Sequence, residues 1–221
     1  MNPNSIVHLL KSISPTIVKD KTFLDIGCNG GGYCFIANRL GAKYTYGFDI
    51  RKKWIDQCLL LRDEVYKIDP KQMHFDIAHI HDLKNLDQQF DVTLFKGVLY
   101  HIPDIIESLK TVCEMTKDIL ILNTAGSAKV PKECMKVFFE NPNSSMAGID
   151  NMAWLVGSAD LLKQLLASFG FKYSRVNMNI IYPARPNLIR VELVAAREEG
   201  SFKRYDRLRK EQGLPIDEPL K

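Results

Sequence analysis

The sequence predicts an α/β fold: a mostly parallel sheet of seven strands with helices on both faces. Short apolar runs alternate with amphipathic segments over most of the chain, which is the pattern of strand-helix-strand units. The run from Phe90 to Phe95 stays apolar after Asp91, as expected for a strand buried on both faces. The length of 221 residues, 46% of them hydrophobic, suits a single domain over 1–221.

The first predicted elements are a helical cover and an opening strand-helix unit. Apolar residues on either side of Pro15 predict a short amphipathic helix and a further turn, so residues 1–20 are expected to form a helical cover on the domain. A strand follows at 22–26 and a helix at 31–40, which ends at Gly41. The glycine-rich turn between them allows a ligand to approach the main chain, and the helix amides that follow favour a negatively charged group.

Four further strands are predicted at 44–48, 73–77, 90–95 and 118–123. A helix is expected at 52–63, and another begins near Pro103, where apolar residues recur on one face. Residues 79–89 read as a polar helix or loop. The order of elements therefore continues the strand-helix alternation to residue 123.

The pattern changes in the last hundred residues. Residues 124–157 predict a long substrate-side loop or insertion, with Val137, Phe138 and Phe139 in a short helix. A helix capped by Ser158 is expected to run to Gly170, followed by strands at 171–178 and 188–196. Residues 197–221 read as a polar tail, either solvated and partly helical or an anion-binding arm, since 203–210 holds five basic residues and one acid.

Composition argues against several classes of protein. The net charge of +4 is too small to indicate nucleic-acid binding by itself. Five cysteines without a CxxC pair predict free thiols, and His79 and His81 have no third ligand nearby, so no metal site is expected. Without a leader or a long apolar run, we expect a soluble cytoplasmic protein with no membrane partner. The oligomeric state is not indicated.

Polar residues stand where the predicted strands end. Asp25, Asp49, Asp76 and the segment 96–101 would line one rim of a parallel sheet, which favours a single cofactor cleft. An acid at the tip of the second strand is suited to hold ribose hydroxyls. No Gly-Lys-Ser/Thr sequence is present, which excludes a phosphate loop, and the acid that precedes the first glycine disfavours a dehydrogenase.

Two motifs in the sequence, one in the glycine-rich turn and one after the fourth predicted strand, resemble those of class I S-adenosylmethionine-dependent methyltransferases. They are Asp25-Ile26-Gly27-Cys28-Asn29-Gly30-Gly31 and Gly97-Val98-Leu99-Tyr100-His101. The likeness is to the branch that includes enzymes alkylating the wobble uridine of tRNA and many bacterial small-molecule methyltransferases. It covers residues 20–125 well and continues weakly through 151–154 and 170–171. It implies the Rossmann-like class I methyltransferase fold and S-adenosylmethionine as the cofactor.

The resemblance also implies roles for individual residues. Asp25 and the turn from Gly27 to Gly31 would hold the methionine moiety, and Asp49 the ribose hydroxyls. The remaining cofactor contacts would come from Ile50, from Asp76 and Ile77 at the adenine, and from Lys96 and Gly97 under the sulfonium. Cys28, Asn29 and Gly31 are the turn residues in this set. Lys96 is unexpected beside a cation, so it either points away or binds an acidic substrate.

The acceptor side is expected near His101. This residue is the candidate general base because imidazole titrates near neutrality, although it could instead be a helix N-terminal residue bonded to the backbone. Tyr100 is a second catalytic and substrate-binding candidate, with core packing as its alternative. Trp154 would cover the acceptor or form an aromatic plug between loop and sheet.

Three functions follow from these observations. The first is methyl transfer from S-adenosylmethionine to oxygen or nitrogen of a small metabolite. The second keeps the cofactor and replaces the acceptor with tRNA, supported by the basic segment near the C-terminus. The third is a non-catalytic protein that binds S-adenosylmethionine or S-adenosylhomocysteine. An enclosed acceptor pocket beneath residues 126–157 would favour the first.

Overall fold

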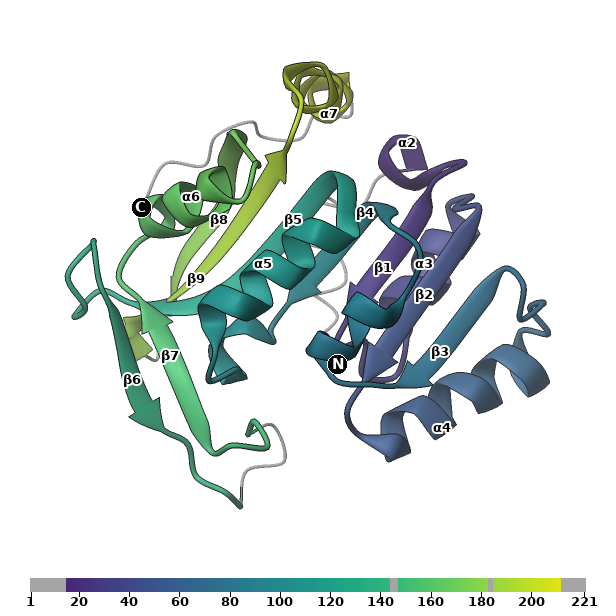
Figure 1. Ribbon diagram of the computed structural model, residues 1–221, viewed down its shortest axis with the longest axis horizontal. Coiled ribbons are helices and arrows are strands. Elements are labelled where there is room, and N and C mark those ends of the chain that lie inside the picture. The colour runs from purple at the N-terminus through teal and green to yellow at the C-terminus, as the bar shows by residue number, and fades with distance from the viewer. Residues whose placement is uncertain (1–14, 144–146, 183–184, 212–221) are drawn as a thin grey trace.

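The computed structural model describes residues 15–143, 147–182 and 185–211. Its centre is a mixed sheet whose main path runs in the order β3-β2-β1-β4-β5-β7-β6 (Figure 1). The parallel core consists of β1 (Thr22–Ile26), β2 (Tyr44–Asp49), β3 (Met73–Ile77), β4 (Phe90–Lys96) and β5 (Thr116–Ser127). The α/β fold with a mostly parallel core is confirmed.

Helices cover both faces of this sheet. One face carries α5 (Ile105–Met115), α6 (Ala159–Ser168) and the 3-10 helix η2 (Ile80–Asn85). The other face carries α2 (Pro15–Val18), α3 (Gly32–Arg39) and α7 (Glu199–Glu211). Helix α4 (Lys52–Leu60) packs with α3 against β3 and continues into a π-helical turn, η1 (Leu61–Val65). In β1, Phe23 packs on the α3 side and Leu24 on the α5 side. Side chains that alternate between two apolar layers explain why the strand is apolar throughout.

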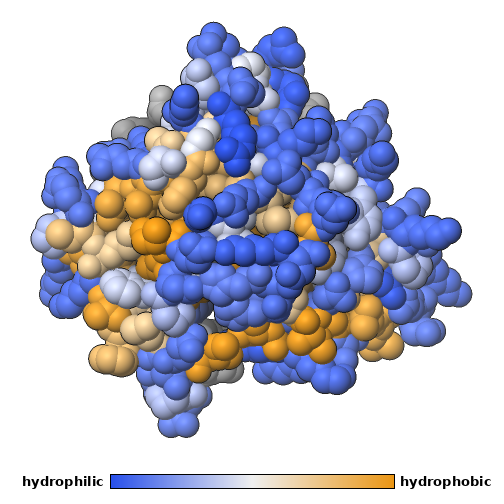
Figure 2. Space-filling view, viewed as in Figure 1, coloured by the Kyte–Doolittle hydropathy of each residue, from blue (hydrophilic) through white to orange (hydrophobic). Residues whose placement is uncertain are grey.

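The segment 124–157 differs most from its prediction. It contains β6 (Met135–Phe139) and β7 (Met152–Val156), an antiparallel hairpin joined to the sheet where Val156 pairs with Gly126. Val137, Phe138 and Phe139 are therefore in a strand, not a helix, and the sheet has nine strands, not seven. These β-branched and aromatic residues favour strands. All three are exposed at the edge of the sheet, so burial imposes neither a helical nor an alternating pattern on them. Figure 2 shows hydrophobic surface on the side where this hairpin lies.

The C-terminal strands are antiparallel. β9 (Arg185–Ala196) pairs with β5 along its length, and β8 (Tyr173–Tyr182) pairs with β9. Phe171, predicted to open the last-but-one strand, is fully buried just before it. The predicted loop around Pro183 lies partly outside the described residues, at 183–184, and Pro186 falls within the bounds of β9.

Both ends of the described chain pack on the sheet. Ile17 and Val18 of α2 are buried in the layer beneath α3, and the rest of the predicted N-terminal cover, residues 1–14, lies outside the described residues. The predicted polar tail is helical as α7, and Tyr205 anchors it with 1% of its surface exposed. Three of its basic residues pair with acids: Lys203 with Glu199, Arg204 with Asp118, and Arg207 with Glu211.

No helix in the described ranges is long and apolar enough to cross a membrane. The five cysteines are free thiols, as predicted.

Arg197 ties the end of β9 to three other segments, and we expect its loss to destabilise the fold. Its guanidinium donates hydrogen bonds to the backbone carbonyls of Thr116, Phe169 and Cys113 and lies 4.5 Å from the ring centroid of Phe171. Arg197→Ala removes these three hydrogen bonds and the contact with Phe171, so the free energy of unfolding should fall by about 2–4 kcal/mol.

Urea unfolding followed by circular dichroism measures this loss. Arg207→Ala, which breaks an exposed pair on α7, is the control and should change stability by less than about 0.5 kcal/mol. Equal stabilities of the two variants would show that the Arg197 hydrogen bonds contribute nothing.

Candidate cofactor and acceptor site

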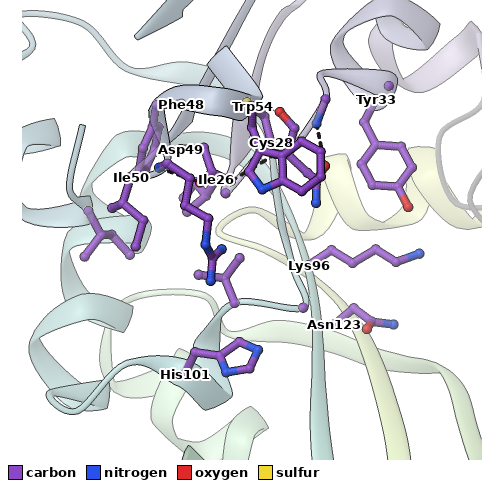
Figure 3. Close-up of a pocket in the computed structure, with 18 of the residues that line it drawn as sticks. Ile26, Cys28, Tyr33, Phe48, Asp49, Ile50, Trp54, Lys96, His101 and Asn123 are labelled. Atoms are coloured by element: carbon purple, nitrogen blue, oxygen red, sulfur yellow. Dashed lines mark hydrogen bonds between the residues drawn. The ribbon is translucent and has the colours of Figure 1, made fainter. Parts of the chain in front are cut away.

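A cavity of about 1170 Å³ opens at the carboxyl ends of β1, β2 and β4. Figure 3 shows Asp49 and Ile50 on one side of the view, with Lys96 and His101 further along. Pockets for a single drug-sized ligand usually measure roughly 300–1000 Å³. The cavity is therefore large enough for a cofactor and a second small molecule.

The glycine corner forms one end of this cavity. Gly27 and Gly31 have φ values of +68° and +74°, in the left-handed region that favours glycine. A Cβ at Gly27 would lie 2.4 Å from Cγ2 of Val98, so no side chain fits there. Asn29 is also left-handed at φ +50°, and its Oδ1 accepts a hydrogen bond from the Gly30 amide at 2.7 Å. The corner thus exposes main-chain atoms to the cavity ahead of α3.

Asp49 connects the end of β2 to the glycine corner. Its Oδ2 accepts from the Asn29 amide at 3.1 Å and its Oδ1 from the Arg51 amide at 2.9 Å. Only 5% of the residue is exposed, and it lines the cavity. Because each carboxylate oxygen has a second lone pair, Asp49 can still accept from two ligand hydroxyls.

Asp25 lies beneath the corner and is 2% exposed. Its Oδ2 has no hydrogen-bond partner among the described residues. Burial, with a further contribution from the Asp49 charge, raises the pKa of the Asp25 carboxyl to about 8, while the Lys96 ammonium opposes the rise. A cationic ligand near this buried carboxyl would favour its ionised form, so the corner fits the positively charged methionine end of the cofactor that the motifs imply.

The raised pKa of Asp25 predicts that the free protein loses stability as pH rises. Unfolded, the carboxyl ionises near its usual pKa of 3.8, whereas in the fold it stays protonated up to about pH 8. This contribution to stability is complete below pH 3.8 and is lost as pH rises to about 8, by at most ~1.4 kcal/mol per pH unit.

Urea unfolding between pH 5 and 8, with Asp25→Asn as the reference, isolates this effect. We expect the wild-type free energy of unfolding to fall relative to the variant over that range. Parallel curves for the two proteins would contradict the raised pKa.

His101 ends the 3-10 helix η3 (Leu99–His101) and lines the cavity away from the glycine corner. The His101 Nδ1 lies 2.8 Å from Oε2 of Glu140. The centroids of the His101 and Tyr100 rings are 4.0 Å apart. Burial lowers the pKa of His101, the Glu140 carboxylate raises it, and the Arg51 and Arg190 charges lower it further. The net result is a pKa below the ordinary value, so the ring is neutral near pH 7.

Lys96 extends toward Tyr33, where its Nζ lies 5.4 Å from the ring centroid (Figure 3). Burial lowers the pKa of Lys96, the nearby Glu192 carboxylate raises it, and Arg190 lowers it again. Gly97, the next residue, has φ +74° and brings the main chain along the cavity wall. Whether Lys96 contacts an acidic substrate stays a prediction.

The cavity unites most of the residues that the sequence singled out. Its lining includes the following: Gly27, Cys28, Asn29, Asp49, Ile50, Lys96, Gly97, Tyr100 and His101. Gly31 and Asp25 lie behind this surface, where a Cβ at Gly31 would meet Cys58 and Phe75 at 2.9 Å.

Asp76, Ile77 and Trp154 lie outside this lining. The Asp76 carboxylate accepts from the Tyr46 hydroxyl at 2.8 Å and pairs with His74, and Ile77 is 53% exposed. Trp154 lines a second cavity of about 570 Å³, beside α5 and α6. Their roles toward adenine and acceptor stay predictions.

Five residues at or beside the cavity were not predicted: Arg51, Trp54, Asn123, Glu140 and Arg190. Arg51 and Trp54 directly follow Asp49 at the start of α4, and that position was a usable signal. Asn123 interrupts the apolar run of β5 and donates to Glu192 at 3.2 Å. Glu140 follows β6, a strand that was not predicted, whereas Arg190 lies in the strand predicted at 188–196, whose antiparallel pairing with β5 the sequence did not indicate.

His79 and His81 have local structural contacts. The His79 ring accepts a hydrogen bond from the His81 amide at the start of η2, and His81 pairs with Asp104. In the parts of the chain that the structure describes, no three His, Cys, Asp or Glu residues are placed to hold a metal ion.

Known proteins resemble both the sequence and the fold. The methyltransferase domain family matches residues 17–170. A tRNA U34 carboxymethyltransferase of Campylobacter fetus subsp. fetus is 36% identical over 93 residues, which cover 42% of this chain and 32% of that protein. The chain spans about a third to a half of the length of the curated relatives that it matches.

Two solved structures extend the likeness to the fold. The N-terminal domain of EvdMO1, solved in the presence of S-adenosylhomocysteine and D-fucose, has a TM-score of 0.74 at 15% identity, covering 90% of this chain and 85% of that one. Magnesium protoporphyrin IX methyltransferase from Synechocystis, with bound S-adenosylmethionine, has a TM-score of 0.58 at 18% identity, covering 88% and 77%. These two structures show the class I methyltransferase fold, and the family match over 17–170 shows that the chain belongs to the methyltransferase domain family, whose members of this fold depend on S-adenosylmethionine.

Proposed function

We propose that this protein transfers a methyl group from S-adenosylmethionine to oxygen or nitrogen of a small molecule. One observation supports a small molecule as the acceptor. The cavity continues past Gly97 to His101 and is bordered there by Gly148, Ile149 and Asp150, from the segment between β6 and β7. An enclosed acceptor space under this segment is the feature that distinguishes a small-molecule enzyme from one with an open substrate surface.

A contact across the cavity supports this covering role. Arg51, at the start of α4, donates from Nη2 to the backbone carbonyl of Ala147 at 2.5 Å. Ala147 is buried, and the following residues continue along the cavity. The hydrogen bond thus links the start of α4, beside Asp49, to the segment that borders the acceptor part of the cavity.

The residues at the glycine corner suit the cofactor in both charge and shape. Asp49 would hold the ribose hydroxyls, Asp25 would face the cationic methionine end, and the main chain at Gly27 and Gly97 would allow close approach. When bound, S-adenosylmethionine supplies a methyl carbon on a sulfonium, a good leaving group. The protein's own task is to hold the acceptor in line with that carbon, and alignment of this kind can reach effective molarities on the order of 10⁵ M or more.

Transfer to tRNA is the second candidate, and the names of the sequence relatives favour it. Those relatives are called carboxymethyltransferases, so the transferred group would also need to be tested. The feature of this chain that suggested RNA, the basic C-terminal segment, supports it weakly. Its residues Lys203, Arg204 and Arg207 are paired with acids, which reduces the charge available to phosphates.

The test is a product-mass screen with methyl-labelled S-adenosylmethionine. The protein is incubated separately with a pool of cell metabolites and with total tRNA, and labelled products are identified by mass spectrometry. Label in a small molecule supports the proposal. Label confined to tRNA would favour the second candidate, and cofactor binding without label in either pool would favour the non-catalytic binder.

A further inference from the structure

Glu140 comes directly after β6 and reaches back to the cavity. Its Oε2 lies 2.8 Å from Nδ1 of His101, and both side chains are well enclosed, with 14% and 16% of their surfaces exposed. The backbone amide of Gly148 donates to the same oxygen at 2.7 Å. Glu140 is therefore held by its own hairpin while it holds the imidazole.

The contact leaves little freedom for the ring. A Cβ at Gly148 would lie 2.9 Å from the His101 Cβ and 3.4 Å from Oε2 of Glu140, so the three residues pack tightly. A carboxylate can only accept a hydrogen bond, which places the imidazole proton on Nδ1. Nε2 is then the nitrogen with a free lone pair, and it is the one able to take a proton.

Burial and the Arg51 and Arg190 charges lower the pKa of His101, whereas Glu140 raises it. The ring is thus neutral before it acts, yet the carboxylate beside Nδ1 can stabilise the cation that forms after a proton arrives. A residue that only capped a helix would need neither a buried carboxylate partner nor a fixed tautomer.

We propose that Glu140 positions His101 as a general base, and that the acceptor group is a hydroxyl. The inference rests on the proposed function and narrows its acceptor class. A neutral hydroxyl is a weak nucleophile that keeps its proton at neutral pH, so it gains from a base as it is methylated, whereas the free amine form of a nitrogen acceptor can attack without first losing a proton.

In this reaction the hydroxyl oxygen of the acceptor is the nucleophile. The acceptor oxygen forms a bond to the methyl carbon, and the carbon–sulfur bond breaks with its electron pair passing to sulfur, which becomes a neutral thioether. The hydroxyl proton passes to Nε2 of His101. The imidazolium that results is paired with the Glu140 carboxylate at Nδ1, and solvent later removes the proton.

The hairpin therefore has two tasks in this proposal. The segment after Ala147 borders the acceptor, and Glu140 at the other end of the same segment fixes the base. The residues that border the acceptor and the residue that orients His101 are tied together, because the Gly148 amide donates a hydrogen bond to Glu140. A variant that weakens the hydrogen bond between Glu140 and His101 should impair catalysis without changing the cofactor end of the cavity.

The test compares Glu140→Gln with Glu133→Gln, an exposed glutamate of the same segment. Nitrogen-15 NMR of histidine-labelled full-length protein reports tautomer and pKa directly, without an acceptor. We expect wild-type His101 to carry its proton on Nδ1. Glu140→Gln should lower the pKa of His101 and weaken this tautomer preference, and Glu133→Gln should leave both unchanged.

The kinetic arm uses methyl-labelled S-adenosylmethionine and the metabolite pool. Glu140→Gln should lower kcat about 10- to 100-fold and move the acid limb of the pH–rate profile to lower pH, with S-adenosylhomocysteine binding unchanged. The product should be a methyl ether. An unchanged tautomer and pH profile, or a methylated amine, would overturn this inference while leaving the proposed function intact. Failure of the wild-type protein to bind S-adenosylhomocysteine would instead remove the proposed function itself.

Discussion

His101→Ala is expected to lower kcat by about 10² to 10⁴, the range usual for loss of a general base. His101 lines the acceptor part of the cavity and is separate from the Asp49 and glycine-corner end. The dissociation constant for S-adenosylhomocysteine should therefore change little. The rate of label transfer gives kcat, and calorimetry on the same preparation gives the dissociation constant.

The comparison of the two measurements decides the role of the residue. A loss of transfer with intact binding fits a group that acts on the acceptor. If kcat stayed at the wild-type value, positioning alone would account for the rate and His101 would be only a helix-end residue. If binding were lost as well, the substitution would have disturbed the fold of the 3-10 helix η3.

Asp49→Ala is expected to weaken S-adenosylhomocysteine binding by about 100-fold or more. The substitution removes the acceptor of two amide hydrogen bonds, from Asn29 and Arg51, and the carboxylate proposed to hold the ribose hydroxyls. Hydrogen bonds to a charged group contribute about 1.5–3 kcal/mol each, so losing one ligand contact and the order of the glycine corner accounts for this change.

Two further variants make the Asp49 result specific. Asp49→Asn keeps one oxygen acceptor and should bind with intermediate affinity. Asp56→Ala removes an exposed carboxylate on α4 that pairs with Lys52, so it should bind as the wild type does. Wild-type affinity in Asp49→Ala would exclude this carboxylate from the cofactor site.

The first five strands were predictable because local pattern and burial agree there. In β1 and β4 both faces of the strand are covered, so apolar runs end cleanly in Asp25-Ile26-Gly27 and in Lys96-Gly97. The glycine corner was predictable for a related reason, since only glycine tolerates the angle and the closeness to Val98 at Gly27.

The hairpin was not predictable in the same way. β6 is an edge strand with exposed Val137, Phe138 and Phe139, so polar and apolar residues do not alternate along it. Its pairing with β7 spans a long segment, and such non-local partners leave no periodicity in the sequence. Glu140, which depends on that pairing to reach His101, was missed for the same reason.

Calorimetric titration of S-adenosylhomocysteine into the wild-type protein tests the central claim, an S-adenosyl cofactor site at the glycine corner. We expect one binding site per chain, competition by S-adenosylmethionine, and an increase in melting temperature that grows with ligand concentration. No heat of binding and no thermal stabilisation at ligand concentrations that saturate other proteins of this fold would contradict the assignment of the cavity to this cofactor.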